Sequence, residues 1–167
     1  MNNFSKLNLS KEFLKNLDSL EFIKMTPIQE KSLPLSLENK DLIAQAKTGS
    51  GKTVAFSIPI VNKLNVKDFK IQSLILAPTR ELANQIAENL RKLSRHIHNV
   101  KVLTLCGGVP FKPQVVSLFH GAHIIVGTPG RVLKHIKEEN IVLSGINTLV
   151  LDEADKMLDM GFYDDIM

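Results

Sequence analysis

The sequence contains no tryptophan, a single tyrosine and a single cysteine, Cys106. One cysteine cannot form a disulfide within the chain, and by itself it cannot build a zinc site. No apolar run approaches the roughly 18 residues of a membrane-spanning helix. The N-terminus also lacks the basic and apolar segments of a signal peptide. These absences predict a cytoplasmic protein without a membrane partner.

The rest of the composition is that of an ordinary globular domain. The 167 residues are 44% hydrophobic and 23% charged, which argues against disorder and low complexity. A chain of this length corresponds to about one domain. The formal net charge of +4 slightly favours a polyanionic partner, although many proteins of this charge bind no nucleic acid.

Short apolar runs alternate with helical patterns along the chain. The runs cover residues 41–46, 73–77, 100–105, 122–126 and 148–151. Continuous apolar runs of this length are typical of strands that are covered on both faces. Apolar residues three and four positions apart, such as Leu82, Ile86 and Leu90, predict an amphipathic helix over residues 81–95. The alternation predicts an α/β fold in which helices flank a mostly parallel sheet.

The first 40 residues differ from the remainder. Two helices are predicted there, over residues 11–20 and 27–37, before the first apolar run begins. We therefore divide the chain into an N-terminal helical segment, residues 1–40, and a ligand-binding lobe, residues 41–167. In open parallel sheets ligands bind at the carboxyl ends of the strands. The residues that follow each apolar run are therefore the candidate site.

A glycine-rich loop follows the first predicted strand. It consists of Ala46, Lys47, Thr48, Gly49, Ser50, Gly51, Lys52 and Thr53. Glycines let successive backbone N–H groups surround a phosphate, and the helix that begins near Thr53 adds a partial positive charge. Lys52 is placed to reach the β- and γ-phosphates, and the Thr53 hydroxyl to bind Mg²⁺. The strict pattern has glycine where Ala46 stands, and the alternative is an ordinary glycine turn before a helix.

Acidic residues follow the fifth predicted strand, in the order Asp152, Glu153, Ala154 and Asp155. Asp152 can hold hydrated Mg²⁺, and Glu153 can orient and deprotonate an attacking water. Adjacent side chains point apart on a strand, so the two carboxylates must lie where the strand bends. The alternative is a solvated helix start, where acidic residues are favoured. Together with the glycine loop, the pair predicts a nucleoside triphosphatase built around one magnesium-bound triphosphate.

The order of these segments resembles one family. AKTGSGKT (46–53), PTRELA (78–83), a glycine pair (107–108), TPGR (128–131) and DEAD (152–155) occur in the order and approximate spacing of DEAD-box RNA helicases. Residues 21–29, EFIKMTPIQ, resemble the adenine-reading motif of that family. The resemblance implies a RecA-like P-loop fold and ATP-dependent unwinding of RNA. Residues 103–111 look closest to a bacterial branch of the family that acts on ribosomal RNA.

The resemblance also implies roles for particular residues. Adenine would be read by the Gln29 amide, which can donate and accept at once, and would stack on Phe4, for which the alternative is a mobile aromatic. Thr26 would tie this motif to the phosphate-binding loop, residues 46–53. Lys52, Asp152 and Glu153 would be catalytic, and Thr53 and Asp152, the latter through water, would hold Mg²⁺. RNA phosphates would be bound, with little sequence preference, by Thr79, Arg80, Gly108, Thr128, Gly130 and Arg131. Alternatives are a structural salt bridge for Arg80 and a solvated helix position for Arg131.

Two positions depart from the family, and some of its parts are not found. The family usually has glycine where Glu21 stands and proline where Met25 stands. The Ser-Ala-Thr motif of the family's first lobe and its entire second lobe do not follow DEAD. We therefore expect the N-terminal lobe of a longer helicase, with the second lobe as its partner. The alternative is an isolated nucleotide- or RNA-binding fragment without turnover of its own.

Overall fold

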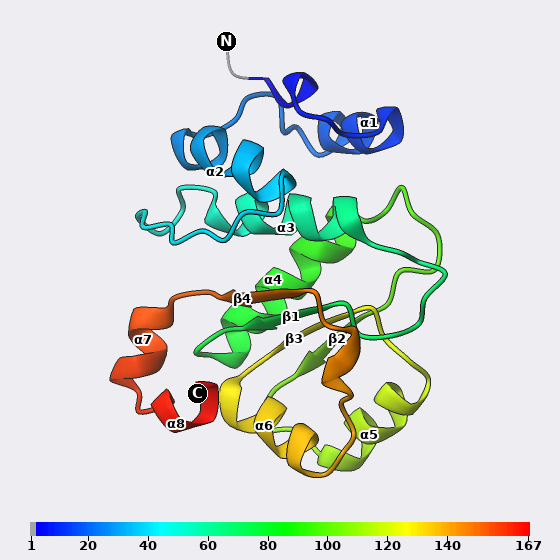
Figure 1. Cartoon of the computed structure of the whole chain (residues 1–167), viewed down its shortest axis with the longest axis vertical. Coiled ribbons are helices and arrows are strands. Elements are labelled where there is room, and N and C mark those ends of the chain that lie inside the picture. Colours follow the sequence, from blue (N-terminus) through cyan, green and yellow to red (C-terminus); the bar gives the residue numbers. More distant parts are fainter. Residues whose placement is uncertain (1–2) are drawn as a thin grey trace. The chain divides into compact units, whose positions relative to one another are not determined.

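The computed structural model describes residues 3–167, which divide into two compact units (Figure 1). The first unit runs to Leu64 and includes Asn89–His98, and the second comprises Asn65–Glu88 and Asn99–Met167. Helix α4, Arg80–Leu93, begins in the second unit and ends in the first. The division at residue 40 that the sequence suggested stays a prediction.

The first unit is helical. Its other elements are η1 (Phe4–Lys6), α1 (Lys11–Ser19), α2 (Pro27–Leu37) and α3 (Lys52–Lys63). The Ser10 hydroxyl caps α1 by accepting a hydrogen bond from the Phe13 backbone N–H at 3.1 Å. Helix α2 opens with Pro27, whose missing N–H would have no partner in a first turn. The helices expected over residues 11–20 and 27–37 are therefore confirmed.

Buried contacts fasten α1 to the end of α4 in this unit. The Asn16 side-chain amide donates to the Leu93 carbonyl at 2.8 Å and to the Lys92 carbonyl at 3.1 Å. The Phe13 ring stacks on the His96 ring with centroids 4.5 Å apart. Burial lowers the pKa of His96. Helices α2 and α3 pack against each other, and the buried apolar residues of this unit include Phe4, Leu17, Leu33, Ile58 and Leu90.

The expected strand over residues 41–46 is wrong. This stretch has no regular secondary structure, and the Ile43 side chain is fully exposed. A strand needs a neighbouring strand to pair its backbone N–H and C=O groups, and the described part of the first unit contains none. The apolar run therefore indicated a segment suited to burial, but it did not identify a pairing partner.

The second unit is built on a four-stranded parallel sheet. Its strands are β1 (Ser73–Leu76), β2 (Val102–Leu105), β3 (Ile124–Gly127) and β4 (Thr148–Leu151), in the order β2-β3-β1-β4. The other four expected strands and the parallel sheet are thereby confirmed. Leu76 lies opposite both Gly127 and Leu151, and Leu105 lies opposite Gly127. The four carboxyl ends therefore share one edge of the sheet.

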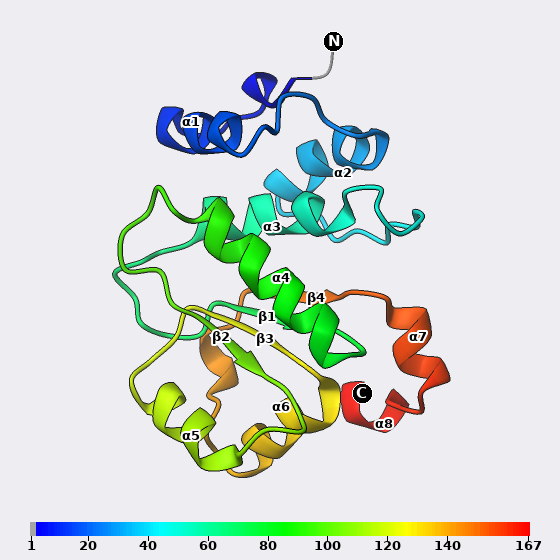
Figure 2. The same cartoon turned by 180° about the vertical axis from the view of Figure 1, so that it is seen from behind.

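Helices lie on both faces of this sheet (Figures 1 and 2), but the edge strand β4 leaves Leu149 and Leu151 exposed, so the expectation of a strand covered on both faces is wrong for residues 148–151. The covering helices are the first part of α4, α5 (Phe111–Phe119) and α6 (Pro129–Lys137). The remaining helices of this unit are η2 (Leu143–Gly145), α7 (Ala154–Asp159) and α8 (Tyr163–Ile166). The two views place α4 across the sheet from α5 and α6. Leu74, Leu76 and Ile125 share a core with Leu118 of α5 and Val132 of α6. No helix within residues 3–167 combines the length and apolarity needed to cross a membrane.

Candidate nucleotide and RNA site

The phosphate-binding loop connects residue 46 to the start of α3. Gly49 and Gly51 have φ angles of 79° and 92°, which glycine adopts without a steric penalty. The Lys52 amine folds back and donates to the carbonyls of Ala46 and Lys47, the latter at 3.2 Å. Within the described residues, the Ser50 hydroxyl is buried and has no hydrogen-bond partner. A glycine loop with an unused hydroxyl, at a helix N-terminus, fits a bound phosphate.

Residues 26–29 lie against this loop. Gln29 is 3% exposed, its Oε1 accepts from the Thr26 backbone N–H at 3.0 Å, and its Nε2 donates to the Gly51 carbonyl at 3.1 Å. A Cβ on Gly51 would stand 2.4 Å from that nitrogen, so glycine is required for the close approach. The hydrogen bond to the loop is therefore made by Gln29, and the Thr26 hydroxyl also lies against the loop, since a Cβ on Gly51 would stand 3.0 Å from its oxygen. One N–H and one lone pair of the Gln29 amide remain, and adenine reading stays a prediction.

Two further positions of the adenine-reading region are defined by the structure. Phe4 belongs to η1 and is 2% exposed, so the ring is packed into the unit and its stacking role stays a prediction. Glu21 has a φ of 62°, in the left-handed region that favours glycine. This backbone conformation explains the glycine that the resembling family has at the same position.

The acid pair lies where β4 turns into α7. Asp152 follows the strand directly, is 8% exposed, and donates its backbone N–H to the Leu76 carbonyl at 3.0 Å. Glu153 has φ 53° and ψ 47°, so the chain bends between the two carboxylates and α7 begins at the next residue. This is the bend that the adjacent acids require. Glu153 Oε2 accepts from the Lys156 amine at 2.9 Å, and this hydrogen bond raises the pKa of Lys156.

The first two candidate RNA loops follow β1 and β2 at the same edge. The Thr79 hydroxyl accepts from the Leu82 backbone N–H at 3.2 Å and so caps α4. Arg80 is exposed, and its guanidinium lies 3.5 Å from Glu81, an exposed pair that contributes little stability. A Cβ on Gly108 would stand 3.4 Å from the Arg80 guanidinium, which places the two loops side by side.

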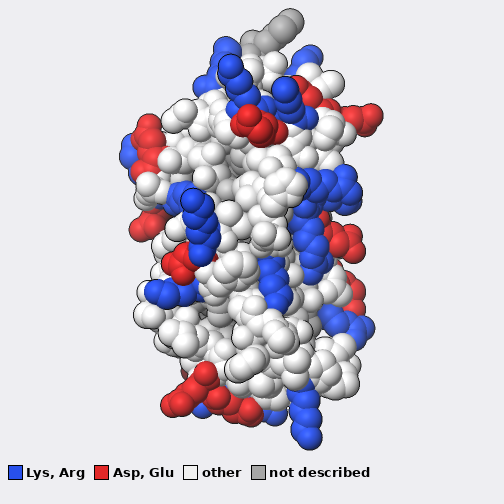
Figure 3. All heavy atoms as spheres, turned by 90° about the vertical axis from the view of Figure 1, so that its right-hand side faces the viewer, with Lys and Arg blue, Asp and Glu red and all other residues white. Residues whose placement is uncertain are grey.

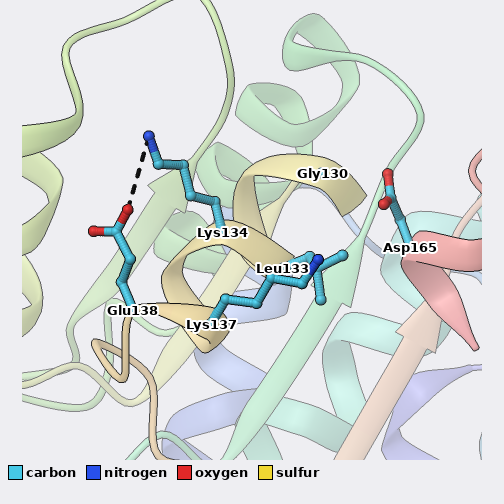
Figure 4. Close-up of a pocket in the computed structure, with 6 residues that line it drawn as sticks. All are labelled: Gly130, Leu133, Lys134, Lys137, Glu138 and Asp165. Atoms are coloured by element: carbon cyan, nitrogen blue, oxygen red, sulfur yellow. Dashed lines mark ion pairs between the residues drawn. The ribbon is translucent and has the colours of Figure 1, made fainter.

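The third candidate RNA loop follows β3 and opens α6. Thr128 precedes the helix, and Arg131 within it is half-buried. Arg131 Nη1 donates to the Val109 carbonyl at 3.0 Å and to Gln114 Oε1 at 2.9 Å, so this residue is not the freely solvated helix position of the alternative. Gly130 is exposed at the rim of a shallow hollow of about 390 Å³, with Asp165 on the opposite side (Figure 4).

Charges of both signs occupy the molecular surface. Figure 3 shows basic and acidic side chains intermixed on one face and separated by uncharged surface. The hollow beside Gly130 follows the same pattern, because Lys134 pairs with Glu138 at 3.8 Å along its wall. The face drawn in Figure 3 and this hollow therefore carry separate basic groups rather than a continuous basic surface.

Sequence reasoning missed two buried residues next to these loops, Gln114 and His135. Gln114 contacts the loop after β2 and the first turn of α6, through the Cys106 carbonyl and Arg131, and His135 contacts Gln114. A lone glutamine and a lone histidine carry no pattern by which they could be found. Cys106, in the same loop, is buried, and burial raises the pKa of its thiol, which favours a packing role.

The sheet, the glycine loop and the acid pair define a RecA-like domain. A model of the DEAD/DEAH box helicase family matches residues 26–167, and the chain belongs to this family. It is 52% identical over 167 residues to the ATP-dependent RNA helicase DbpA of Escherichia coli, covering 99% of this chain and 36% of that protein. It is 50% identical over 166 residues to the DEAD-box ATP-dependent RNA helicase CshA of Geobacillus kaustophilus, covering 99% and 35%. The chain thus spans about a third of the length of these relatives.

Solved structures agree with this family and confirm the expected fold. A DEAD box protein from the hyperthermophile Methanococcus jannaschii matches with a TM-score of 0.94 at 42% identity, covering 99% of this chain and 45% of that one. Dbp5 of Saccharomyces cerevisiae, in a structure bound to RNA and ADP BeF3, matches with a TM-score of 0.89 at 36% identity, covering 99% and 42%.

Proposed function

We propose that this chain is the N-terminal lobe of an ATP-dependent RNA helicase that couples hydrolysis of Mg-ATP to the separation of RNA strands. The names of the E. coli and Geobacillus relatives support this activity. The observation that carries it is the phosphate-binding loop, where the Lys52 amine, held by two loop carbonyls, and the unused Ser50 hydroxyl stand at the start of α3.

In this proposal residues 46–53 bind the triphosphate and residues 26–29 read the base. A bound phosphate would replace the carbonyls of Ala46 and Lys47 as the hydrogen-bond acceptor of the Lys52 amine, since an anion is a stronger acceptor than a carbonyl. The Gln29 amide keeps its hydrogen bond to Gly51 and uses its remaining N–H and lone pair for adenine, and Phe4 stacks on the base. The recognition of base and phosphate is therefore coupled through Gln29.

Mg²⁺ is proposed to bind through side-chain oxygens, and the chemistry of the donors supports this. The Thr53 hydroxyl and the Asp152 carboxylate are oxygen donors, which this ion prefers, and Mg²⁺ in such sites keeps waters and phosphate oxygens as its other ligands. Bound there, it would neutralise charge on the phosphates. Glu153 is the proposed base: it would exchange its contact with the Lys156 amine for a water molecule and accept that water's proton.

RNA is proposed to bind along the carboxyl edge of the sheet. The candidates are Thr79, Arg80, Gly108, Thr128, Gly130 and Arg131, all in loops or first helical turns after β1, β2 and β3. Such groups contact phosphates and carry no base information, so we expect little sequence preference. The resemblance of residues 103–111 to a bacterial branch of the family supports ribosomal RNA as the target. The greater length of the E. coli relative, of which this chain covers 36%, supports a second lobe that completes the active site.

The catalytic assignment is tested in the full-length protein by Glu153→Gln. This variant should bind ATP within about threefold of wild type and lose about 10²–10⁴-fold in turnover, the usual contribution of a general base. The exposed Glu88→Gln on α4 is the matched control and should keep its activity. Lys52→Ala should instead lose ATP binding. Normal turnover by Glu153→Gln would refute the role of Glu153.

The 167-residue chain by itself is expected to bind nucleotide or RNA without appreciable turnover. This alternative is favoured by the 36% of the E. coli relative that the chain covers. The ATPase rate of the chain, measured with and without RNA, distinguishes the two proposals. RNA-stimulated turnover by these residues alone would contradict the second one.

A further inference from the structure

A buried amide connects the loop after β2 to helix α6. Gln114 of α5 is 8% exposed, and its Nε2 donates to the Cys106 carbonyl at 3.1 Å. Its Oε1 accepts from Arg131 Nη1 at 2.9 Å and lies 2.9 Å from His135 Nε2. One side chain therefore joins the end of β2 to two successive turns of α6.

The guanidinium of Arg131 is held in one orientation by these contacts. Its Nη1 has two hydrogens, and both are used, one by Gln114 and one by the Val109 carbonyl at 3.0 Å. Val109 follows the glycine pair, so the same nitrogen fixes the loop that carries Gly108. The remaining guanidinium N–H groups, on Nη2 and Nε, have no acceptor among residues 3–167 and are available to a ligand.

His135 supports the amide from within the core. The residue is fully buried, and its ring stacks on Phe111 with centroids 4.1 Å apart and planes 15° from parallel. Because Gln114 Oε1 can only accept, His135 Nε2 must carry the proton and donate it. The other ring nitrogen, Nδ1, is buried without a partner within the described residues. Burial, followed by the charge of Arg131, lowers the pKa of His135, which keeps the ring neutral.

Packing alone does not account for this arrangement. Burying polar groups costs free energy unless they are hydrogen-bonded, and apolar side chains would fill the same space at no such cost. The buried polar network is adjacent to groups that the proposed function assigns to RNA phosphates. Arg131 and His135 donate to the same oxygen, Gln114 Oε1, and this shared contact constrains Arg131 and the Gly108 loop together.

We propose that Gln114 and His135 are positioning residues for RNA phosphate binding. They hold Arg131 and the Gly108 loop in one arrangement, in which the guanidinium N–H groups on Nη2 and Nε and the loop backbone bind the same RNA strand. Both residues are buried and act only through Arg131 and the loop. This inference rests on the proposed function, since the strand it positions is the RNA.

Two substitutions of His135 separate positioning from packing. His135→Gln keeps a neutral N–H donor for Gln114, whereas His135→Phe keeps an aromatic ring for Phe111 but has no donor. Binding of a fluorescent single-stranded oligouridylate to the full-length protein, with a non-hydrolysable ATP analogue, is measured over a range of salt concentrations. We expect His135→Gln to bind within about twofold of wild type. His135→Phe should bind about tenfold more weakly, equivalent to ~1.4 kcal/mol, and lose about 0.7 from the salt slope, one phosphate contact.

The controls keep the test decisive. His120→Phe makes the same change at an exposed residue after α5 and should leave affinity and salt slope unchanged. Should His135→Phe fail to fold, as thermal unfolding would show, Gln114→Met removes the hydrogen bonds to Cys106, Arg131 and His135 at similar volume and should weaken binding at least as much. Wild-type affinity and slope in the folded donor-less variants would overturn the inference, as would weaker binding by His135→Gln than by His135→Phe. A wild-type protein that binds no oligouridylate would overturn the proposed RNA function together with the inference.

Discussion

Two apolar runs of this chain have the same sequence character and different structures. Residues 148–151 form β4, which pairs with β1 from Thr148 opposite Ser73 to Leu151 opposite Leu76, and the acid pair follows. Residues 41–46 form no strand, and the phosphate-binding loop follows them. A strand thus depends on an available partner as much as on its own apolar residues. Where no partner is described, the loop is shaped by its own glycines and by Gln29.

The comparison implies that the two regions are fixed by different means. Register within the sheet determines where the residues after β1, β2, β3 and β4 lie, so those positions depend on the fold of the second unit. In the first unit a side-chain amide bonded to one backbone carbonyl holds the phosphate-binding loop. Substitutions at the sheet edge should therefore affect folding most, and substitutions in the loop should affect ligand binding as well.

The largest effect on stability is expected for Gly127→Ala at the end of β3. The added Cβ would stand 2.5 Å from the Leu105 carbonyl oxygen and 2.5 Å from Val132 Cγ2. The carbonyl is backbone and cannot move without disturbing the β2–β3 ladder, so we expect a loss of about 3 kcal/mol, measured by urea unfolding. Gly107→Ala, which meets no atom within 4 Å, is the control and should stay within about 0.5 kcal/mol. Equal effects of the two substitutions would mean that register does not fix this edge.

A smaller loss, combined with weaker ligand binding, is expected for Gly51→Ala in the phosphate-binding loop. The new Cβ would stand 2.4 Å from Gln29 Nε2, and φ is 92°. The amide can move away, but only by breaking its bond to Gly51, so we expect about 2 kcal/mol of destabilisation. Nucleotide affinity should fall more than about tenfold in titration calorimetry, since the loop and residues 26–29 would separate.

Gly49→Ala is the matched control in the same loop. Its φ of 79° brings a similar backbone strain, of about 1–2 kcal/mol, but no atom lies within 4 Å of the added Cβ. If both alanine variants lost stability equally, the contact between Gln29 and Gly51 would not be what holds the loop.

The sequence predicted most of the second unit because its signals are local. Four apolar runs, the helices between them and the bend at Glu153 follow from residues adjacent in the chain. The failure at residues 41–46 concerns pairing, which is not a local property. Gln114 and His135 escaped prediction for a related reason, since the packing of α5 against α6 brings them together from 21 positions apart.

Lowering the pH should destabilise both units, and by different amounts. Burial lowers the pKa of His135 in the second unit and of His96 in the first. Each unfolded histidine titrates near 6.5, so the unfolded chain binds more protons, and the stability is present above that pH and lost below it. The charges of Arg131 and Lys134 lower the pKa of His135 further, and Glu138 opposes them. The charge of Glu12 instead opposes the lowering of the His96 pKa.

Thermal unfolding at pH 7 and pH 5 measures this difference. His135→Gln, which is neutral at both values, should reduce the drop in Tm by roughly 2–4 °C, equivalent to about 1 kcal/mol. His96→Gln should reduce it by less. His120→Gln, an exposed control, should leave the drop unchanged. A larger reduction for His96→Gln would mean that the charge of Arg131 adds nothing to the burial of His135.

The smallest effect is expected at Glu21, where the first unit departs from its family. A φ of 62° costs a residue other than glycine about 1–2 kcal/mol, and Glu21→Gly would remove this strain. Glycine loses more chain entropy on folding, which offsets about 0.5–1 kcal/mol of the stabilisation. Glu21→Gly should therefore stabilise the protein by about 0.5 kcal/mol in urea unfolding. Asn39→Gly, at a φ of 65°, should gain less because asparagine tolerates this conformation. Glu139→Gly, at a φ of 56° in the second unit, should gain as much as Glu21→Gly, since the strain is a property of the residue and not of the unit. If Glu21→Gly destabilised the protein while Glu139→Gly did not, the Glu21 side chain would contribute stability that outweighs the strain of its backbone.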